Sequence, residues 1–199
     1  IMGSPGKIEI IKNNIFNYES VKNILQNCDY CINFCGQLFE KKISFNQLHS
    51  EWPGMLAKIS NEFNIKKLIH VSALNPEKNH PSQYMSSKMS GEENIKNNIK
   101  NYFIIRPSLV FGNGDDQFFS TFGTMSQFSP IIPIPGDGKT LFSPVHASDC
   151  ADAINKLLEI ENPKDRTFEI TGTTNYSFKN LVEIFLKEIK KKKFLISIP

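Results

Sequence analysis

The sequence lacks the features that mark membrane-spanning and nucleic-acid-binding proteins. No apolar run approaches the roughly 18 residues that a membrane-spanning helix needs, and no signal peptide is predicted at its start. The net charge is only +3 over 199 residues. The main body has no concentrated basic face of the kind that binds nucleic acid. We therefore expect neither a transmembrane segment nor a nucleic-acid partner.

Cysteine is also scarce. The chain has four cysteines, and three of them, Cys28, Cys31 and Cys35, lie close together. No histidine pair at a suitable spacing completes a zinc set with them, so no metal site is predicted. We expect buried, reduced thiols instead. Such cysteine usage fits a reducing compartment, the cytosol or an equivalent space.

One basic run lies near the end of the chain, where the letters KEIKKKKF cover Lys187 to Phe194. Lysines at a helix end are typical of a solvated face, and they suit the negative end of the helix dipole. The alternative is docking on an acidic membrane surface, to which lysine clusters are attracted. The sequence leaves both interpretations open.

Strand and helix patterns alternate along the whole chain. Short, near-continuous apolar runs are typical of strands covered on both faces, and apolar residues at helical spacing are typical of packed helices. The strands are expected within residues 7–12, 29–36, 66–74, 101–112, 166–172 and 194–199, and the helices within residues 17–27, 52–63, 81–100, 118–128, 148–160 and 177–193. Such alternation predicts an α/β fold, a doubly wound parallel sheet with helices on both faces.

In a sheet of this kind, ligands bind outside the carboxyl ends of the strands. The predicted strands end near Asn14, Gly36, Ser72 and Arg106, so these positions are the first candidates for a binding site. A glycine at a strand end lets the backbone approach a ligand closely, which makes Gly36 the most informative of the four.

Tyr84 and Lys88 are candidates for chemistry as well as binding. They stand four residues apart in a predicted helix, about one turn, so their side chains share a face. A free tyrosine has a pKa of about 10, and a neighbouring ammonium group would lower it by favouring the phenolate. A phenol tuned in this way can exchange a proton with a substrate oxygen. The alternative is an exposed pair at the start of a solvated helix.

Several segments together resemble the short-chain dehydrogenase/reductase superfamily, in its extended or atypical branch. They occur in the order of that family and cover most of the chain: NFCG, HVSAL, YMSSK, RPSLVFGNGD and FSPVHASDCADAI. Each segment alone is weak evidence, and the set is specific. The resemblance implies a Rossmann-like sheet that binds NADP(H) or NAD(H).

The same resemblance implies roles for individual residues. Tyr84 is the expected acid/base, and Lys88 is expected to bind the nicotinamide ribose and tune the tyrosine. Ser72 is the third catalytic candidate, or it only touches the cofactor. The other expected contacts follow the dinucleotide from its adenine through its middle to its nicotinamide: Asn14 and Ile15, Cys35 and Gly36, and Arg106, Pro107 and Ser108.

A narrower resemblance is to the nucleotide-binding accessory subunits of respiratory complex I and their bacterial relatives. It is carried by the segments INFCGQLFEKK, HVSALNPEKNHPSQYMSSKMSGEE, RPSLVFGNGDDQFF and IPGDGKTLFSPVHASDCADAI. It implies a largely structural nucleotide and partner subunits in a membrane respiratory complex. The location would be cytoplasmic, peripheral on the inner membrane, or the mitochondrial matrix of a eukaryote. The alternative is an NAD(P)-dependent reductase or epimerase acting on a nucleotide sugar or a similar carbonyl/alcohol substrate.

The chain departs from the superfamily in two places. A member should open with a strand and a glycine-rich turn whose amides hold the pyrophosphate. Residues 1–6 offer no such turn, so the chain is interpreted as lacking its first βα unit, and NAD against NADP stays undecided. Ser72 is followed by Ala73 and Leu74, where active members carry further serines that polarise a carbonyl. This replacement favours a binder over a fast enzyme.

Two regions are expected on this basis. Residues 1–110 should form a partial NAD(P)-binding Rossmann core. Residues 111–199 should form a C-terminal region, which includes a small substrate or docking lobe and a strand and helix that return to the sheet.

Overall fold

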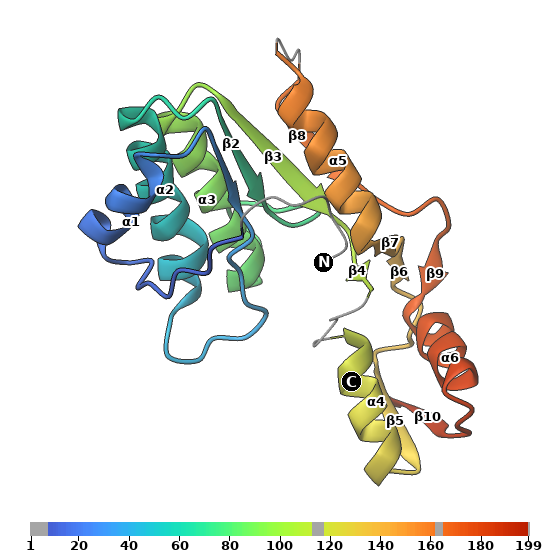
Figure 1. The fold of residues 1–199 in the computed structure, drawn as a ribbon. Helices are drawn as coiled ribbons and strands as arrows, with labels where there is room; N and C mark the ends of the chain where they lie inside the picture. The colour runs from blue at the N-terminus through green and yellow to red at the C-terminus, as the bar shows by residue number, and fades with distance from the viewer. Residues whose placement is uncertain (1–7, 113–117, 162–164, 199) are drawn as a thin grey trace. The chain divides into compact units, whose positions relative to one another are not determined.

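The computed structural model describes residues 8–112, 118–161 and 165–198, and the chain divides into two compact units. Unit 1 comprises Ile1–His70 and Glu77–Tyr102, and unit 2 comprises Val71–Pro76 and Phe103–Pro199. The predicted alternation of helices and strands is confirmed, and the main strand pair of each unit runs parallel (Figure 1). The fold is therefore α/β, as the sequence predicts.

Unit 1 contains, in chain order, the elements α1 (Tyr18–Leu25), β1 (Tyr30–Asn33), η1 (Asn46–Glu51), α2 (Trp52–Glu62), β2 (Lys67–Val71) and α3 (Gln83–Asn98). Its three α-helices lie side by side (Figure 1). The side chain of Asn17 caps α1 by accepting a hydrogen bond from the Ser20 amide at 3.0 Å, which confirms the predicted start of that helix. Pro53 lies in the first turn of α2 and has no amide hydrogen to donate to a carbonyl of the preceding turn.

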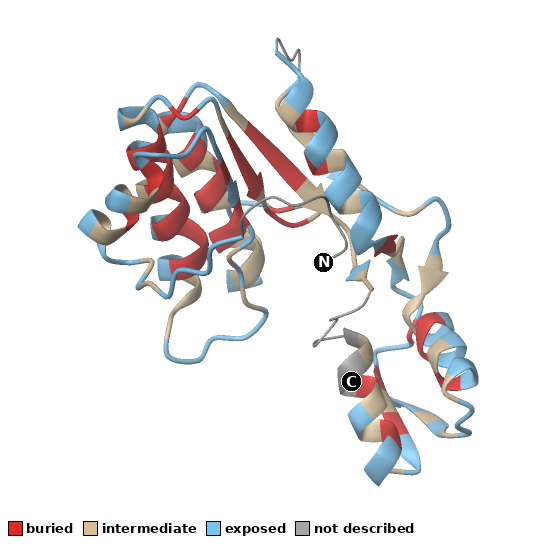
Figure 2. Ribbon diagram, in the orientation of Figure 1, coloured by how far each residue is buried: buried red, intermediate tan, exposed pale blue. Residues whose placement is uncertain are grey.

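The apolar core of unit 1 lies between its helices and one face of its strand pair (Figure 2). Cys31 of β1 and Leu68 of β2 are partners in the parallel register, and both are buried in the same cluster as Trp52. Side chains alternate between the faces of a strand. Tyr30 and Ile32 accordingly point to the other face of β1 and remain exposed.

Unit 2 contains more and shorter elements: β3 (Tyr102–Pro107), β4 (Val110–Phe111), α4 (Phe118–Phe128), β5 (Ile131–Pro135), β6 (Leu141–Phe142), β7 (Val145–His146), α5 (Ala147–Glu159), β8 (Thr167–Ile170), β9 (Tyr176–Ser177), α6 (Phe178–Glu188) and β10 (Phe194–Ile198). Strand β3 pairs with β8, β4 with β7 and β5 with β10, all in parallel, and β6 pairs with β9 antiparallel. A small core forms where α4 and α6 cover β5.

The β5–β10 pair is apolar on both faces. Ile132 and Ile134 of β5 point into the small core and are buried. On the opposite face, Ile131 is paired with Phe194 of β10 in the parallel register, and both are exposed. The predicted final strand is thus present, and within the described residues its partner is β5.

The predicted strand at residues 7–12 is wrong over its described part. Residues 8–12 have no regular secondary structure, and Ile8, Ile10 and Ile11 are exposed. A strand is stabilised by pairing and by burial of one face. The described residues provide neither for this segment, so its alternating apolar pattern does not produce a strand. Residue 7 lies outside the described residues.

Two helix boundaries also differ from the prediction. Helix α5 is capped by His146, whose ring accepts a hydrogen bond from the Ser148 amide, and Ser148 itself is already helical. Helix α6 ends at Glu188. Lys190 then adopts a left-handed conformation with φ of 55°, and the remaining lysines of the run lie beyond the helix because that conformation ends it.

The cysteines are free, as predicted, but they are not uniformly buried. Cys31 is buried, Cys35 and Cys150 are partly buried, and Cys28 is exposed. Cys28 lies just beyond the end of α1 and is exposed. Among the described residues, no helix has both the length and the apolar character needed to cross a bilayer.

Candidate functional site

Tyr84 and Lys88 lie in the first two turns of α3 and share a face, as their spacing predicts. The Lys88 Nζ atom lies 5.9 Å from the centre of the Tyr84 ring. Lys88 is only 4% exposed, and lysine is almost never buried to this extent unless it has partners. The pair is therefore enclosed within unit 1, and the alternative of a solvated helix start is wrong for Lys88.

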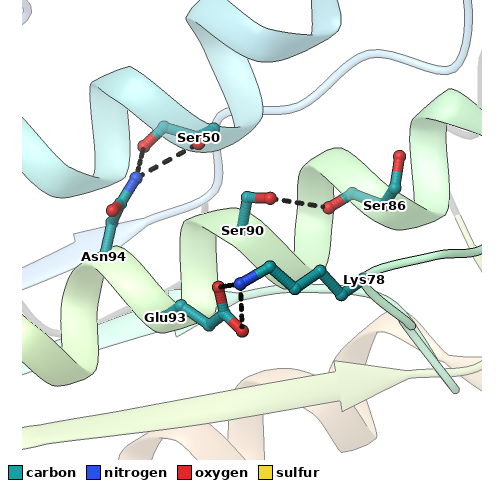
Figure 3. Close-up of polar contacts among 6 residues, drawn as sticks. All are labelled: Ser50, Lys78, Ser86, Ser90, Glu93 and Asn94. Atoms are coloured by element: carbon teal, nitrogen blue, oxygen red, sulfur yellow. Dashed lines mark hydrogen bonds and ion pairs between the residues drawn. The ribbon is translucent and has the colours of Figure 1, made fainter.

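Helix α3 is anchored on both of its sides. Figure 3 shows the Asn94 amide donating to the Ser50 carbonyl oxygen at 3.0 Å and to its hydroxyl at 3.1 Å. On another face, Lys78 pairs with Glu93 at 3.0 Å, which ties the preceding loop to the helix. The buried amide contact is the firmer of the two, since exposed ion pairs contribute little. These contacts fix the helix that carries Tyr84 and Lys88.

The electrostatics of the pair differ from the expectation. Burial lowers the pKa of Lys88 to about 8, and the neighbouring Cys35 and Glu92 oppose that shift. Burial also raises the pKa of Tyr84 above its ordinary value. The predicted lowering of the tyrosine pKa by Lys88 is thus wrong for the protein alone, because the loss of hydration disfavours the phenolate.

The strand-end glycine lies beside the lysine, as the predicted edge of the sheet requires. A β-carbon added to Gly36 would lie 3.1 Å from Lys88 Nζ and 3.9 Å from His49 Nε2. The Cys35 amide donates to the Asn33 side chain at 3.0 Å, which holds the chain as it leaves β1. The structure thus brings together four of the predicted site residues, namely Cys35, Gly36, Tyr84 and Lys88.

His49 is a member of this cluster that the sequence did not reveal. It is 1% exposed. Its Nε2 atom accepts a hydrogen bond from the Gln37 amide at 3.1 Å, and its Nδ1 atom lies 3.0 Å from the Ser87 hydroxyl. Burial, with Lys88 nearby, lowers the pKa of His49 to about 4. The predicted helix began at Trp52, so His49 belonged to no expected element and no local pattern marked it.

Two aromatic rings, those of Phe45 and His49, contact the ring of Tyr84. The His49 ring stacks on Phe45, with centroids 5.2 Å apart and planes inclined by 22°. Both rings meet Tyr84 edge to face, at centroid distances of 5.3 Å for His49 and 5.8 Å for Phe45. Such arrangements are the favoured ones for aromatic pairs. They favour the observed orientation of the Tyr84 ring.

A second buried network lies at the end of β1. The side-chain oxygen of Asn33 accepts hydrogen bonds from the Cys35 amide and from the Trp52 indole at 3.1 Å. The side-chain nitrogen of Asn33 lies 2.9 Å from His70 Nδ1, its partner in the parallel register. His70 is fully buried, as expected for a core residue, and burial lowers its pKa to about 3. This network fixes the strand end from which Gly36 follows.

The predicted adenine contacts lie in the loop before α1. The Asn14 side chain accepts a hydrogen bond from the Phe16 amide at 3.1 Å, and its carbonyl accepts from the Asn17 amide at 3.0 Å. The side chain of Asn14 thus stabilises its own turn. Ile15 is partly buried against the apolar core of unit 1.

The remaining predicted site residues belong to unit 2. The Ser72 amide donates to the Ile105 carbonyl at 2.7 Å, and the Ser72 hydroxyl is buried with no hydrogen-bond partner among the described residues. Arg106 pairs with Glu169 at 3.7 Å. Pro107 is the last residue of β3. The Ser108 amide and hydroxyl donate to the carbonyls of Ile170 and Ser143.

Unit 2 also has a cavity of its own, with a volume of about 470 Å³. Its lining includes His146 and Asp149 of the β7–α5 junction, and the rings of Phe111 and Phe119. The Phe111 ring meets both the His146 and the Phe119 rings edge to face. No sequence pattern predicted this cavity, since its walls come from four separate parts of unit 2.

Metal ligation finds no support within the described residues. Cys28 and Cys31 are separated by two residues, but no group of three or more histidine, cysteine, aspartate or glutamate side chains there is placed to hold an ion. The absence of a metal site therefore remains a prediction from the sequence, and the described residues present no candidate ligand set.

Comparison with protein families places most of the chain in one of them. The profile of the family described as "RmlD substrate binding domain" matches residues 53–197, well over half of the chain. The matched region includes Ser72, Tyr84, Lys88 and the segment from Arg106 to Ser108.

Curated relatives cover the chain almost completely. The NADH-ubiquinone oxidoreductase 40 kDa subunit of Neurospora crassa mitochondria is 24% identical over 100% of this chain and 52% of that protein. The mitochondrial NADH dehydrogenase [ubiquinone] 1 alpha subcomplex subunit 9 is 26% identical in Dictyostelium discoideum, over 94% of this chain and 51% of that protein. The mouse protein of the same name is 27% identical over 92% of this chain and 48% of its own length. The chain thus spans about half the length of the curated relatives it matches.

Solved structures share the fold at low identity. The dTDP-4-dehydrorhamnose reductase of Bacillus anthracis, in complex with NADP, superposes with a TM-score of 0.75 at 19% identity, over 93% of this chain and 71% of that one. MoeE5 in complex with UDP-glucose and NAD gives a TM-score of 0.79 at 13% identity, over 94% of this chain and 71% of that one. These likenesses establish the fold, a parallel α/β architecture common to nucleotide-sugar reductases and related enzymes.

Proposed function

Because the chain belongs to the family described as the RmlD substrate binding domain, we propose that unit 1 holds the nicotinamide ribose of NADP(H) or NAD(H). The single observation that carries this proposal is the buried ammonium group of Lys88 beside Gly36 at the end of β1. A cation buried to this extent is rare in proteins and marks a candidate site for a ligand. Strand carboxyl ends are where α/β proteins bind such ligands.

The residues present fit this part of a dinucleotide. Gly36 has no side chain, and any larger residue there would bring its β-carbon within 3.1 Å of Lys88 Nζ. Lys88 supplies hydrogen-bond donors for ribose hydroxyls, and Tyr84 supplies a donor or acceptor one turn away. When bound, the nicotinamide ring supplies hydride transfer. This chain's residues bind and orient the nucleotide and exclude water around it.

We further propose that the nucleotide is largely structural. The pKa of Tyr84 is raised by burial, so in the protein alone its phenol stays protonated near neutral pH and releases its proton less readily. Ala73 and Leu74 stand where further serines would polarise a substrate carbonyl, and one such donor is worth roughly 3–4 kcal/mol in comparable sites. Both features support a binder over a fast enzyme.

The proposed place of this binder is an accessory or assembly subunit of an NADH:quinone oxidoreductase. The names of the curated relatives, all subunits of that mitochondrial enzyme, support it. The proposal includes a peripheral position on the membrane that carries the complex, through other subunits. Co-purification of the tagged complete protein with that complex tests it, and purification as a free species would contradict it.

The other predicted contacts of the nucleotide remain proposals: Ser72, Arg106, Pro107, Ser108, Asn14 and Ile15. The Ser72 hydroxyl is buried and has no hydrogen-bond partner within the described residues. A bound nucleotide could supply the hydrogen bond that a buried hydroxyl normally makes. The Asn14 side chain is engaged in its own turn, so a contact from this residue is proposed through its backbone.

A second function is favoured by the structural comparison. The fold matches enzymes solved with NADP, or with NAD and a nucleotide sugar. The alternative is therefore an NAD(P)-dependent reductase or epimerase that acts on a nucleotide sugar or a similar carbonyl/alcohol pair. It requires Tyr84 as the group that exchanges a proton with the substrate oxygen.

The release rate of nicotinamide nucleotide from the complete protein separates the two functions. Release over hours, with the Tyr84→Phe variant retaining the nucleotide, is expected for a structural cofactor. Exchange within seconds, with turnover that Tyr84→Phe abolishes in a folded protein, would establish the enzyme instead. A complete protein that neither carries nor takes up nicotinamide nucleotide would refute both.

A further inference from the structure

The segment that carries His49 has an unusual helical form. η1 is a π-helical stretch of six residues, Asn46–Glu51, which continues directly into α2. π-helical turns are rare, and they occur frequently at functional sites. This turn places His49 in the buried space between the end of β1 and helix α3.

Both ring nitrogens of His49 have defined partners, which fixes the form of the ring. The Ser87 hydroxyl donates its hydrogen to the Tyr84 carbonyl at 2.8 Å, so it can only accept from His49 Nδ1. The Gln37 amide donates to Nε2, which therefore carries no hydrogen. These contacts require a neutral imidazole protonated at Nδ1.

The two partners belong to the two sides of the candidate site. Gln37 directly follows Gly36 in the turn after β1, and Ser87 directly precedes Lys88 on α3. The single side chain of His49 therefore forms a bridge that connects the turn after β1 to helix α3. The His49 ring also contacts the ring of Tyr84 edge to face, about one turn before Ser87 on the same helix.

We propose that His49 is a positioning residue, whose two hydrogen bonds hold the Gly36–Gln37 turn against the Tyr84–Lys88 helix and thereby set the geometry of the nucleotide site. This inference rests on the proposed binding of a nicotinamide nucleotide at that site. His49 acts through Gln37 and Ser87, and it is not proposed to touch the nucleotide. The competing explanation is that the ring only fills space between Phe45 and Tyr84.

Three substitutions separate hydrogen bonding from space filling. His49→Asn keeps a donor near the Nδ1 position, for Ser87, and loses the acceptor for Gln37. His49→Gln places an amide oxygen near the Nε2 position, for Gln37, and loses the donor for Ser87. His49→Phe keeps the ring and loses both hydrogen bonds. Lys58→Gln, on the exposed face of α2, is the control for a change of surface.

The readout is the release rate of NADPH from the complete protein. We expect His49→Phe to release it about tenfold faster than the wild type, which corresponds to about 1.4 kcal/mol, and the Asn and Gln variants to fall between. Lys58→Gln should release NADPH as the wild type does. Wild-type release from His49→Phe, with faster release from the Asn and Gln variants, would show that the ring only fills space and would overturn the proposal.

A second measurement needs neither a variant nor a nucleotide. Nitrogen-15 NMR of the wild-type protein should show His49 protonated at Nδ1, with Nε2 coupled across a hydrogen bond to the Gln37 amide. A ring protonated at Nε2, or a Gln37 amide that exchanges freely with solvent, would overturn the bridge even if His49→Phe failed to fold. If the spectrum is as expected but no nicotinamide nucleotide binds, the proposed function fails and the bridge stands as a property of the fold.

Discussion

The carbonyl oxygen of His49 lies against the α-carbon of Gly91, where η1 crosses α3. A β-carbon built on residue 91 would lie 1.9 Å from that oxygen, far inside any real contact. The two backbones approach this closely because residue 91 is a glycine. The closeness of η1 and α3 depends on this glycine as well as on the hydrogen bonds of His49.

Gly91→Ala is expected to destabilise the protein by about 2–4 kcal/mol, because the added methyl group meets backbone that cannot rotate away. Urea unfolding followed by circular dichroism measures the loss. Gly123→Ala in α4 is the matched control, since among the described side chains its methyl group would meet the Phe185 ring at 3.6 Å, an ordinary contact. An alanine at residue 91 without loss of stability would mean that η1 and α3 can separate at little cost.

Asn33→Ala is expected to cost about 2–4 kcal/mol, since it leaves the Trp52 indole, the Cys35 amide and a nitrogen of His70 without their partner. The same unfolding measurement applies, with tryptophan fluorescence as a local probe. The exposed Asn101, replaced by alanine, is the control. A loss no larger than that of the control would contradict the role of the network.

Stability should fall as the pH falls from about 6.5 towards 4. The folded pKa values of His49 and His70 are lowered to about 4 and about 3, whereas an unfolded histidine titrates at about 6.5. In this window the unfolded chain binds protons that the folded protein does not, so the free energy of unfolding drops by about 1.4 kcal/mol per pH unit for each histidine. Above pH 6.5 the two histidines contribute no pH dependence. Lys88, the nearby cation, opposes protonation of both.

Urea unfolding at pH 7, 6 and 5 measures this slope. The His49→Gln variant should show a shallower one, because one of the two titrating groups is gone. Parallel slopes for the wild type and the variant would mean that His49 is protonated equally in the folded and unfolded states.

Lys88→Met is expected to stabilise the protein without nucleotide by about 1–3 kcal/mol at pH 7. The folded pKa of Lys88 is about 8 against an ordinary 10.5, so folding opposes its charge, and that cost is present in full below pH 8. The wild type should gain stability between pH 8 and 10.5, and the variant should not. The same variant should bind nicotinamide nucleotide more weakly. A less stable Lys88→Met protein would show that the partners of the lysine outweigh its burial.

Local features of the fold were predictable from the sequence because their causes are local. Asn17 caps α1 at the predicted start of that helix, and the four-residue spacing put Tyr84 and Lys88 on one face. The segment at residues 8–12 has the right composition for a strand. Whether this segment forms a strand depends on a neighbouring strand to pair with, and composition does not reveal such a partner.

The site contacts that the sequence did not reveal join residues that are far apart in the chain. His49 is separated by 38 residues from Ser87, and Asn33 by 37 from His70. No local pattern links either pair. The pKa of Tyr84 was predicted to fall because the cation could be inferred from spacing. The burial that raises it follows from the stacked rings of Phe45 and His49, and only the folded structure brings these together.

The π-helical form of η1 makes the length of this segment matter as much as its composition. One turn of η1 holds more residues than an α-helical turn, so deleting any single residue from Asn46–Glu51 would let the stretch relax into a regular continuation of α2. The residues before η1 would keep nearly the same orientation, because the π-turn already absorbs one extra residue, whereas His49, inside the stretch, would move from its place between Gln37 and Ser87. Single-residue gaps, which surface loops usually accept, should therefore be excluded from this stretch in functional descendants of the protein, while substitutions on its exposed side are tolerated.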